Sequence, residues 1–328
     1  MGRVQVSTIL AVYNGAATVA RALDSALCQR FQGTSEIVVV DDGSTDATSD
    51  VLSAYRGGIK IVRQRNRGLA AARNAGVAAA GGDFLAFLDA DDVWKPERLA
   101  KTVAPLVNDP DVVLVFSDLI PADGNGVELA SGYVRAGVAH APSMEELLDR
   151  WWPILPSTVT MRRETFETCN GFWEQFKGAN GFEDTWLWLL ARERGRFDYV
   201  GEPLVVYRLT PFVERMRRYA PGFGVFARQM RRRWGAAGEA YIRRNAKALA
   251  WLLTLRGIRY VADGDIRGAR RAMFCALRFR PRADAARRAL ATLLPRPNAQ
   301  KMITRARSHP RTPLDGAILS GAIPVDLR

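Results

Sequence analysis

The chain has 328 residues, of which 48% are hydrophobic and 25% are charged, and its formal net charge is +13. These proportions are those of a globular protein and allow one large domain or two ordinary ones. The charge is divided unevenly, because residues 212–328 hold 26 Lys and Arg against 7 Asp and Glu, whereas residues 1–211 hold 21 and 27. We therefore expect a mildly acidic front region joined to a strongly basic tail.

The spacing of the cysteines and the hydropathy of the chain argue against a disulfide-rich, a secreted or a membrane-spanning protein. The three cysteines are widely separated, so we expect neither a disulfide framework nor a cysteine metal cluster. The first residues lack the layout of a signal peptide, and nowhere are there about 18 consecutive apolar residues, the length of a membrane-spanning helix. The sequence therefore predicts a cytoplasmic protein.

Short apolar runs alternate with amphipathic stretches along the front region. The predicted strands are residues 6–12, 36–40 and 58–64 and the run DFLAFLDADD. Helical patterns follow the first three strands, in ATVARALDSALCQ, near Ser44–Asp46 and at residues 68–80. This alternation is typical of an α/β fold with a mostly parallel sheet and helices on both of its faces.

Polar residues follow three of these strands directly. Asn14 follows the first strand, Asp41–Asp42 the second, and Asp89–Asp92 come directly after the buried part of the fourth. Because ligands of parallel sheets collect at the carboxyl ends of the strands, we expect these side chains to share one rim.

The chain changes character after this point. Residues 111–118 predict another strand, and mixed patterns continue to about residue 211, beyond which the chain reads as Arg-rich helices. We place the boundary between Thr210 and Arg218 and predict two domains, residues 1–214 and an all-α region at 215–328.

The first two motifs each allow two interpretations. VVVDDGSTD is a good turn and helix cap, but a carboxylate there can also accept hydrogen bonds from a nucleobase or a ribose hydroxyl. NRGLAAARNAG predicts an Ala-rich helix packed closely on the sheet. That packing does not explain Arg73, which can pair with a phosphate or steady the aspartates.

The later motifs are equally open on their own. DADD is either a solvated acidic turn or a pair of acids offering oxygens to one hard divalent cation, which shares its other ligands with substrate phosphates. In GFEDTWLWLL, Glu183 and Asp184 either favour the helix N-terminus or supply a general base. Trp173, Trp186 and Trp188 are either core residues or apolar faces on which a sugar ring stacks.

The motifs in this order resemble the family 2 glycosyltransferases: VSTILAVYNG, VVVDDGSTD, NRGLAAARNAG, FLDADD, NGFWE and FEDTWLWLL, ending in YR at Tyr207–Arg208. The resemblance covers about residues 4–210. It implies the nucleotide-sugar-binding GT-A fold. It also implies transfer of an activated sugar, usually with Mg²⁺ or Mn²⁺, with inversion at the anomeric carbon.

The resemblance also implies roles for the residues of the donor motifs. Tyr13 would lie against the nucleobase, Asp42 would hold the base or the ribose, and Arg73 would belong to the donor pocket. Asp91 matches the acid that binds the metal, with Asp89 supporting it or contacting the ribose. Uridine is the commonest base in the family, but these residues leave guanosine and thymidine open.

For the acceptor side, Asp184 matches the catalytic base, and Glu183 and Trp186 would support the acceptor or a loop. The sequence departs from the family after YR, where many members have a His in a loop that closes over the diphosphate. Here that His is missing. Either Arg215, Arg217 or Arg218 serves the phosphate instead, or the loop works differently.

The basic tail carries a further resemblance. Residues 255–281 resemble one tetratricopeptide-type helical hairpin, within a predicted hairpin near 250–281. The preceding helix mixes Arg with aromatic residues. It is either a solvated face over an apolar stripe or a surface that rests on anionic lipid at the inner face of the membrane. No nucleic-acid recognition motif accompanies the charge, so we expect no nucleic-acid partner.

The sequence thus predicts an inverting, metal-dependent glycosyltransferase that moves a sugar from a nucleotide diphosphate to a hydroxyl of a glycan or lipid-linked acceptor, in cell-surface polysaccharide synthesis. Within enzymes, a nucleotidyltransferase would want a basic Gly-rich loop that AVYNGAATV lacks. The alternative from another class is a catalytically silent adaptor that docks partners through the basic helical tail. Turnover of a donor would separate the enzyme from the adaptor.

Overall fold

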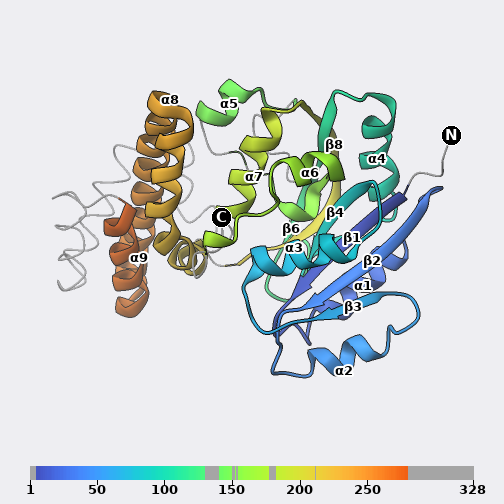
Figure 1. Ribbon diagram of the computed structural model, residues 1–328. Coiled ribbons are helices and arrows are strands. Elements are labelled where there is room, and N and C mark those ends of the chain that lie inside the picture. Colours follow the sequence, from blue (N-terminus) through green and yellow to red (C-terminus); the bar gives the residue numbers. More distant parts are fainter. Residues whose placement is uncertain are drawn as a thin grey trace. The chain divides into compact units, whose positions relative to one another are not determined.

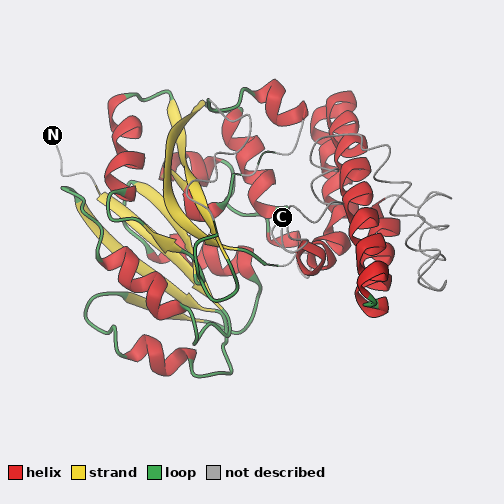
Figure 2. Cartoon of the chain, turned by 180° about the vertical axis from the view of Figure 1, so that it is seen from behind, coloured by secondary structure: helices red, strands yellow, loops and turns green. Residues whose placement is uncertain are grey.

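The computed structural model describes residues 5–129, 140–149, 152, 154–176, 182–210 and 212–279. The chain divides into two compact units, one of Met1–Leu148 with Trp152–Arg208 and the other of Asp149–Trp151 with Leu209–Arg328. Figure 1 shows the elements of both units, and Figure 2 shows that strands belong to the first while the second is helical.

The first unit is built on an eight-stranded sheet of order β3-β2-β1-β4-β7-β6-β8-β5. Its strands are β1 (Gln5–Val12), β2 (Thr34–Asp41), β3 (Lys60–Arg63), β4 (Phe84–Asp89), β5 (Val93–Trp94), β6 (Val112–Ala122), β7 (Val159–Arg162) and β8 (Arg196–Arg208). β1 to β4 pair in parallel, whereas β7 runs antiparallel to both of its neighbours. The parallel half confirms the predicted α/β fold, and the carboxyl ends of its strands share one edge.

Helices cover both faces of this sheet. They are α1 (Val19–Leu27), α2 (Thr48–Ser53), α3 (Leu69–Ala79), α4 (Arg98–Asn108), α5 (Met144–Asp149), α6 (Arg163–Thr168) and α7 (Glu183–Arg192). α1 buries Val19, Ala22, Leu23 and Ala26, a helical spacing of three and four residues. These side chains join the main apolar core with residues of β1, β2, β4 and α4.

The Ala-rich helix α3 packs closely on the opposite face, as its composition predicts. Ala72 packs against Ala11 and Val40 of the sheet. A Cβ atom at Gly76 would lie 2.6 Å from Cγ2 of Ile9, which is too close for any side chain. The small residues of this helix therefore bring its backbone, and Arg73 with it, close to β1 and β2.

The three cysteines differ in exposure. Cys28 is exposed at the C-terminal end of α1, whereas Cys169 and Cys275 are buried. Burial raises the pKa of the Cys169 thiol to about 11. Over the described part of the chain, no helix is both long enough and apolar enough to cross a membrane.

The second unit contains α8 (Phe212–Asp263), which is interrupted by the non-helical backbone of Gly235, and α9 (Ile266–Phe279). The end of α8 and α9 form a helical hairpin, in which a Cβ atom at Gly257 would lie 2.8 Å from Met273. This is where the tetratricopeptide-like hairpin is predicted. Its class stays a prediction, and Pro281 and the residues beyond lie outside the described part.

Candidate active site

The loops after β1 and β2 are tied together at the edge of the sheet. The Oδ1 atom of Asn14 accepts a hydrogen bond from the amide of Thr45 at 2.8 Å, and the amide of Asn14 donates to the hydroxyl of Ser44 at 3.0 Å. Tyr13, the predicted base-stacking residue, is 51% exposed beside them. The two loops thus form a single surface on which the ring of Tyr13 is available to a ligand.

Asp42 is buried and anchors the loop that leads into α3. Its carboxylate accepts hydrogen bonds from the amides of Arg67 and Gly68, both at 2.9 Å, and from the side chain of Gln64 at 2.7 Å. Gly43 adopts a φ of +79°, and a Cβ atom there would lie 2.8 Å from the amide nitrogen of Asn66. A carboxylate has about four acceptor positions, so three bonds within the chain leave room for one ligand donor.

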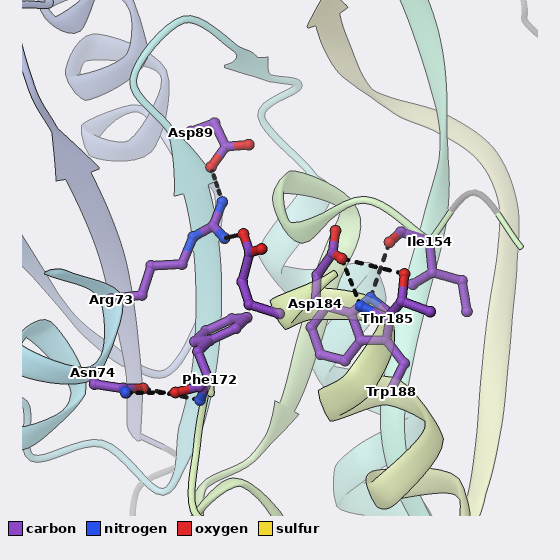
Figure 3. Close-up of polar contacts among 9 residues, drawn as sticks. Arg73, Asn74, Asp89, Ile154, Phe172, Asp184, Thr185 and Trp188 are labelled. Carbon is purple, nitrogen blue, oxygen red and sulfur yellow. Dashed lines mark hydrogen bonds and ion pairs between the residues drawn. The ribbon is translucent and has the colours of Figure 1, made fainter. Parts of the chain in front are cut away.

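Arg73 is buried and joins two groups of acids (Figure 3). It donates to Oδ1 of Asp89 at 2.5 Å and to Oε1 of Glu183 at 3.4 Å. Its guanidinium also lies 5.1 Å from the ring centroid of Phe172. Burial alone would lower the pKa of Arg73, but the two carboxylates outweigh burial and raise it. The structure therefore places Arg73 as a link between the end of β4 and the start of α7.

The main chain of Phe172 is held by Asn74, the residue that follows Arg73 in α3. The side chain of Asn74 donates to the carbonyl of Phe172 at 2.7 Å and accepts from its amide at 2.9 Å. Gly171 has a φ of +64°, and a Cβ atom there would lie 2.7 Å from Oδ1 of Asn74. This pair of hydrogen bonds brings the segment that precedes α7 against α3.

Asp184 lies in the first turn of α7, where the sequence predicts it. It accepts hydrogen bonds from the amide of Thr185 at 2.5 Å and from its hydroxyl at 3.3 Å. Burial, together with the neighbouring charge of Glu183, raises the pKa of Asp184 to about 7. A carboxyl group with this pKa exchanges a proton readily at neutral pH.

The three tryptophans near α7 separate into two kinds. Trp188 is buried, and its Nε1 donates to the carbonyl of Ile154 at 3.0 Å, so it belongs to the core. Trp173 and Trp186 are only partly buried, and their rings lie 5.6 Å apart at 33°. Trp186 belongs to α7, two residues after Asp184, and the contact between the rings joins Trp173 to this helix.

In the turn that follows β4, one acidic side chain is exposed to solvent and the next is buried. Asp91 is exposed, whereas Asp92 is 1% exposed and its pKa is raised by burial and by the charges of Asp91 and Asp89. Across the described residues, no three His, Cys, Asp or Glu side chains converge in a way that encloses a metal ion. An ion at Asp91 would thus need ligands from a substrate as well.

A cavity of about 260 Å³ lies beside Asp91 and was not predicted from the sequence. Arg21 of α1 and Arg208 of β8 line it, and their guanidinium groups donate to the carbonyls of Asn125 and Gly124, respectively. Apart from Asp91, the only residue of this cavity that a sequence motif had pointed to is Arg208, in the YR motif.

The arginines expected to serve a phosphate belong to α8. Arg217 is exposed there, and the side chains of Arg215 and Arg218 lie outside the described part.

Many solved structures are similar to this chain, and two of them illustrate the likeness. The structure of S. aureus TarS 1–349 in complex with UDP is 19% identical, with a TM-score of 0.52 and coverage of 92% of both chains. The mannosyltransferase PcManGT from Pyrobaculum calidifontis, in complex with GDP-Man and Mn²⁺, is 17% identical, with a TM-score of 0.59 and coverage of 98% of this chain and 85% of that one. These likenesses support the GT-A fold.

Curated relatives have higher sequence identity to this chain, over shorter stretches. The uncharacterized glycosyltransferase alr2836 of Nostoc sp. is 45% identical over 125 residues, which are 37% of this chain and 38% of that protein. The succinoglycan biosynthesis protein ExoO of Rhizobium meliloti is 36% identical over 142 residues, 42% of this chain and 40% of that protein. The chain thus spans about two fifths of the length of these relatives. The family model for glycosyl transferase family 2 matches residues 7–173, so the chain belongs to glycosyl transferase family 2.

Proposed function

We propose that this chain is an inverting, metal-dependent glycosyltransferase that moves a sugar from a nucleotide diphosphate to an acceptor hydroxyl. The observation that carries the proposal is the link through Arg73, because it joins the acid turn after β4 to the first turn of α7. One side of this link offers oxygens to a cation and the other offers a base, which are the two groups that sugar transfer from a diphosphate requires.

The donor is proposed to lie over the loops after β1 and β2. The exposed ring of Tyr13 would contact the base, and Asp42 would accept one hydrogen bond from the base or the ribose. We propose UDP as the nucleotide, since the similar TarS structure holds UDP, while the GDP-Man in PcManGT keeps guanosine as the second candidate. Arg73 and Asp89 would support this site through their ion pair.

The metal is proposed to be Mg²⁺ or Mn²⁺ held by Asp91. The residues fit such an ion, because it takes one or two carboxylates and completes its shell with water and phosphate oxygens. Asp91 is exposed at the turn and Asp89 is 26% exposed, so both carboxylates are within reach of a ligand. When bound, the cation would neutralise the charge that develops on the leaving diphosphate.

The base is proposed to be Asp184. It would take the proton of the acceptor hydroxyl while that oxygen forms a bond to the anomeric carbon, and the bond from this carbon to the diphosphate oxygen breaks on the opposite side. The configuration at the carbon is thereby inverted. Glu183, which pairs with Arg73, would act as a positioning residue that also keeps the pKa of Asp184 high.

The acceptor is proposed to be a glycan or a lipid-linked sugar. Trp173 and Trp186 form a partly exposed aromatic pair, which offers apolar faces to a sugar ring. The relationship to ExoO, a succinoglycan biosynthesis protein, supports a role in polysaccharide synthesis.

The second unit is proposed to bind anionic membrane surfaces, with the protein in the cytoplasm and at the inner face of the membrane. Residues 212–279 hold 16 Lys and Arg against 4 Asp and Glu. On α9, Arg267, Arg270 and Arg271 are exposed and flank Phe274, which is 64% exposed. We expect the protein to sediment with phosphatidylglycerol vesicles and not with phosphatidylcholine vesicles. Equal recovery with both would contradict this part of the proposal.

Calorimetric titration with UDP, GDP and dTDP, each with and without Mn²⁺, tests the proposed function. We expect one nucleotide to bind much more tightly than the others, and only in the presence of Mn²⁺. Binding of none of the three would contradict the enzyme and favour the silent adaptor. The matching UDP-sugar or GDP-sugar, incubated with Mn²⁺, should then be hydrolysed slowly even without an acceptor.

A further inference from the structure

Ser157 contacts both ends of the acid turn that follows β4. It lies in the short 3₁₀ helix Pro156–Thr158, is fully buried, and precedes β7. Its hydroxyl accepts a hydrogen bond from the amide of Asp89 at 3.0 Å and donates to Oδ2 of Asp92 at 2.5 Å. A single hydroxyl thus joins the first and last residues of the turn.

Asp92 carries this connection onward to the end of β8. Its Oδ1 accepts a hydrogen bond from the amide of Arg208 at 2.9 Å. The carbonyl of Ser157 accepts a further bond from Nε1 of Trp94 at 2.8 Å, which fixes the strand β5 that follows the turn. The turn is therefore held by neighbours that lie 65 to 116 residues away in sequence.

Asp91 and Asp92 differ in solvent exposure, and this difference indicates different roles. Asp92 is 1% exposed, and both of its oxygens already accept hydrogen bonds from Ser157 and Arg208, whereas Asp91 is exposed. A buried carboxylate that is used in this way is poorly placed to bind an ion at the surface. It is well placed to hold a backbone turn in one conformation.

We infer that Ser157 and Asp92 are positioning residues, which hold the turn so that Asp91 presents its carboxylate to the cation and its diphosphate. This inference rests on the proposed function. Its physical basis is that a site whose ligands are held before binding loses less conformational entropy when the ligand arrives. Without the Ser157 hydroxyl, the turn would have to be ordered by the ion itself.

The test measures Mn²⁺ binding by electron paramagnetic resonance, in the presence of the nucleotide that calorimetry selects. We expect Ser157→Ala and Asp92→Ala to weaken Mn²⁺ binding at least about tenfold. Asp92→Asn keeps an acceptor for the Arg208 amide, and its side-chain NH₂ can donate to the Ser157 oxygen in place of the bond that the Ser157 hydroxyl donates in the wild type, so this variant should retain most of the affinity. If Asp92 were itself a ligand of the metal, the Asn variant would lose Mn²⁺ binding as well.

Ser117 provides a matched control, because it is equally buried but donates to the carbonyl of Asp118 on β6. Ser117→Ala should bind Mn²⁺ like the wild type. Wild-type affinity in Ser157→Ala, or an equal loss in Ser117→Ala, would overturn the inference. If Ser157→Ala does not fold, Ser157→Cys takes its place, because Cys is similar in size and has a weak hydrogen-bond donor. Ser157→Cys should bind Mn²⁺ with an intermediate affinity. An unchanged affinity in this variant would overturn the inference. Absence of Mn²⁺ binding in the wild type would contradict the proposed metal site itself.

Discussion

Asp184→Asn is expected to lower kcat by about 10²–10⁴-fold, the usual contribution of a general base. Asn keeps the size and the acceptor oxygen of the side chain, so the hydrogen bonds from Thr185 can persist. What it loses is the capacity to take a proton from the acceptor hydroxyl. The measurement is steady-state transfer at saturating donor and acceptor, where differences in binding do not contribute. A kcat within about threefold of the wild type would exclude Asp184 as the base.

The pH profile of the wild type gives a second readout of this prediction. Because the base must be ionised, kcat/KM should rise with pH and reach half of its plateau near the Asp184 pKa of about 7. Glu183→Gln removes the neighbouring negative charge that helps to raise this pKa, so the rising limb should move to lower pH. If the rising limb of the Glu183→Gln profile stays at the wild-type pH, the assignment of this limb to Asp184 is contradicted.

The free energy of unfolding of Asp184→Asn shows whether a lower kcat comes from the missing base or from a damaged fold. The pKa of Asp184 is raised in the folded state from 3.8 to about 7, so the folded state binds more protons than the unfolded state between these values. The contribution of Asp184 to stability therefore falls as the pH rises through this window. At about pH 8, Asp184→Asn should be more stable than the wild type by about 1–2 kcal/mol, allowing for partial solvent exposure. Near about pH 4 the difference should vanish.

Asp91→Asn is expected to abolish nucleotide binding that depends on Mn²⁺ and to lower kcat/KM at least about 10²-fold. The amide keeps one oxygen but removes the negative charge, which is the main attraction for a divalent cation. Since Asp91 is exposed, its replacement should change the free energy of unfolding by no more than about 0.5 kcal/mol. The loss should thus be one of binding and not of folding.

The calorimetric titration of this variant needs a control that also removes one carboxylate from the first unit. Asp50→Asn serves, because Asp50 is exposed in the first turn of α2. It should bind the nucleotide and Mn²⁺ as the wild type does. Retention of metal-dependent binding in Asp91→Asn would exclude Asp91 as the ligand and turn attention to Asp89.

The local features of this site could be predicted from the sequence, because they depend on neighbouring residues. Alternation of apolar runs and amphipathic stretches predicts β1, β2 and β4, and the polar residues that follow them must then share the edge where parallel strands end. The start of α7 at Glu183 was likewise predicted from an acidic pair before an apolar run. In each case a few consecutive residues carry the whole signal.

What the sequence could not predict is which distant groups meet. Arg73 pairs with Glu183, which lies 110 residues away, and no local pattern relates the two positions. Ser157 is a single serine after a proline, and only the pairing of β7 with β4 brings it to the acid turn. The anchoring of the 64–68 loop by Asp42 was missed for the same reason.

The differing exposure of the cysteines has a practical consequence for spectroscopy. Cys28 is exposed, while Cys169 and Cys275 are buried, and the raised pKa of Cys169 keeps its thiol protonated at neutral pH. A nitroxide reagent should therefore label the native chain at Cys28 without any engineered cysteine. That label and a Mn²⁺ ion bound at the proposed Asp91 site would form a pair of paramagnetic centres within the first unit. Dipolar broadening between them would locate the ion relative to α1 in the unmutated protein.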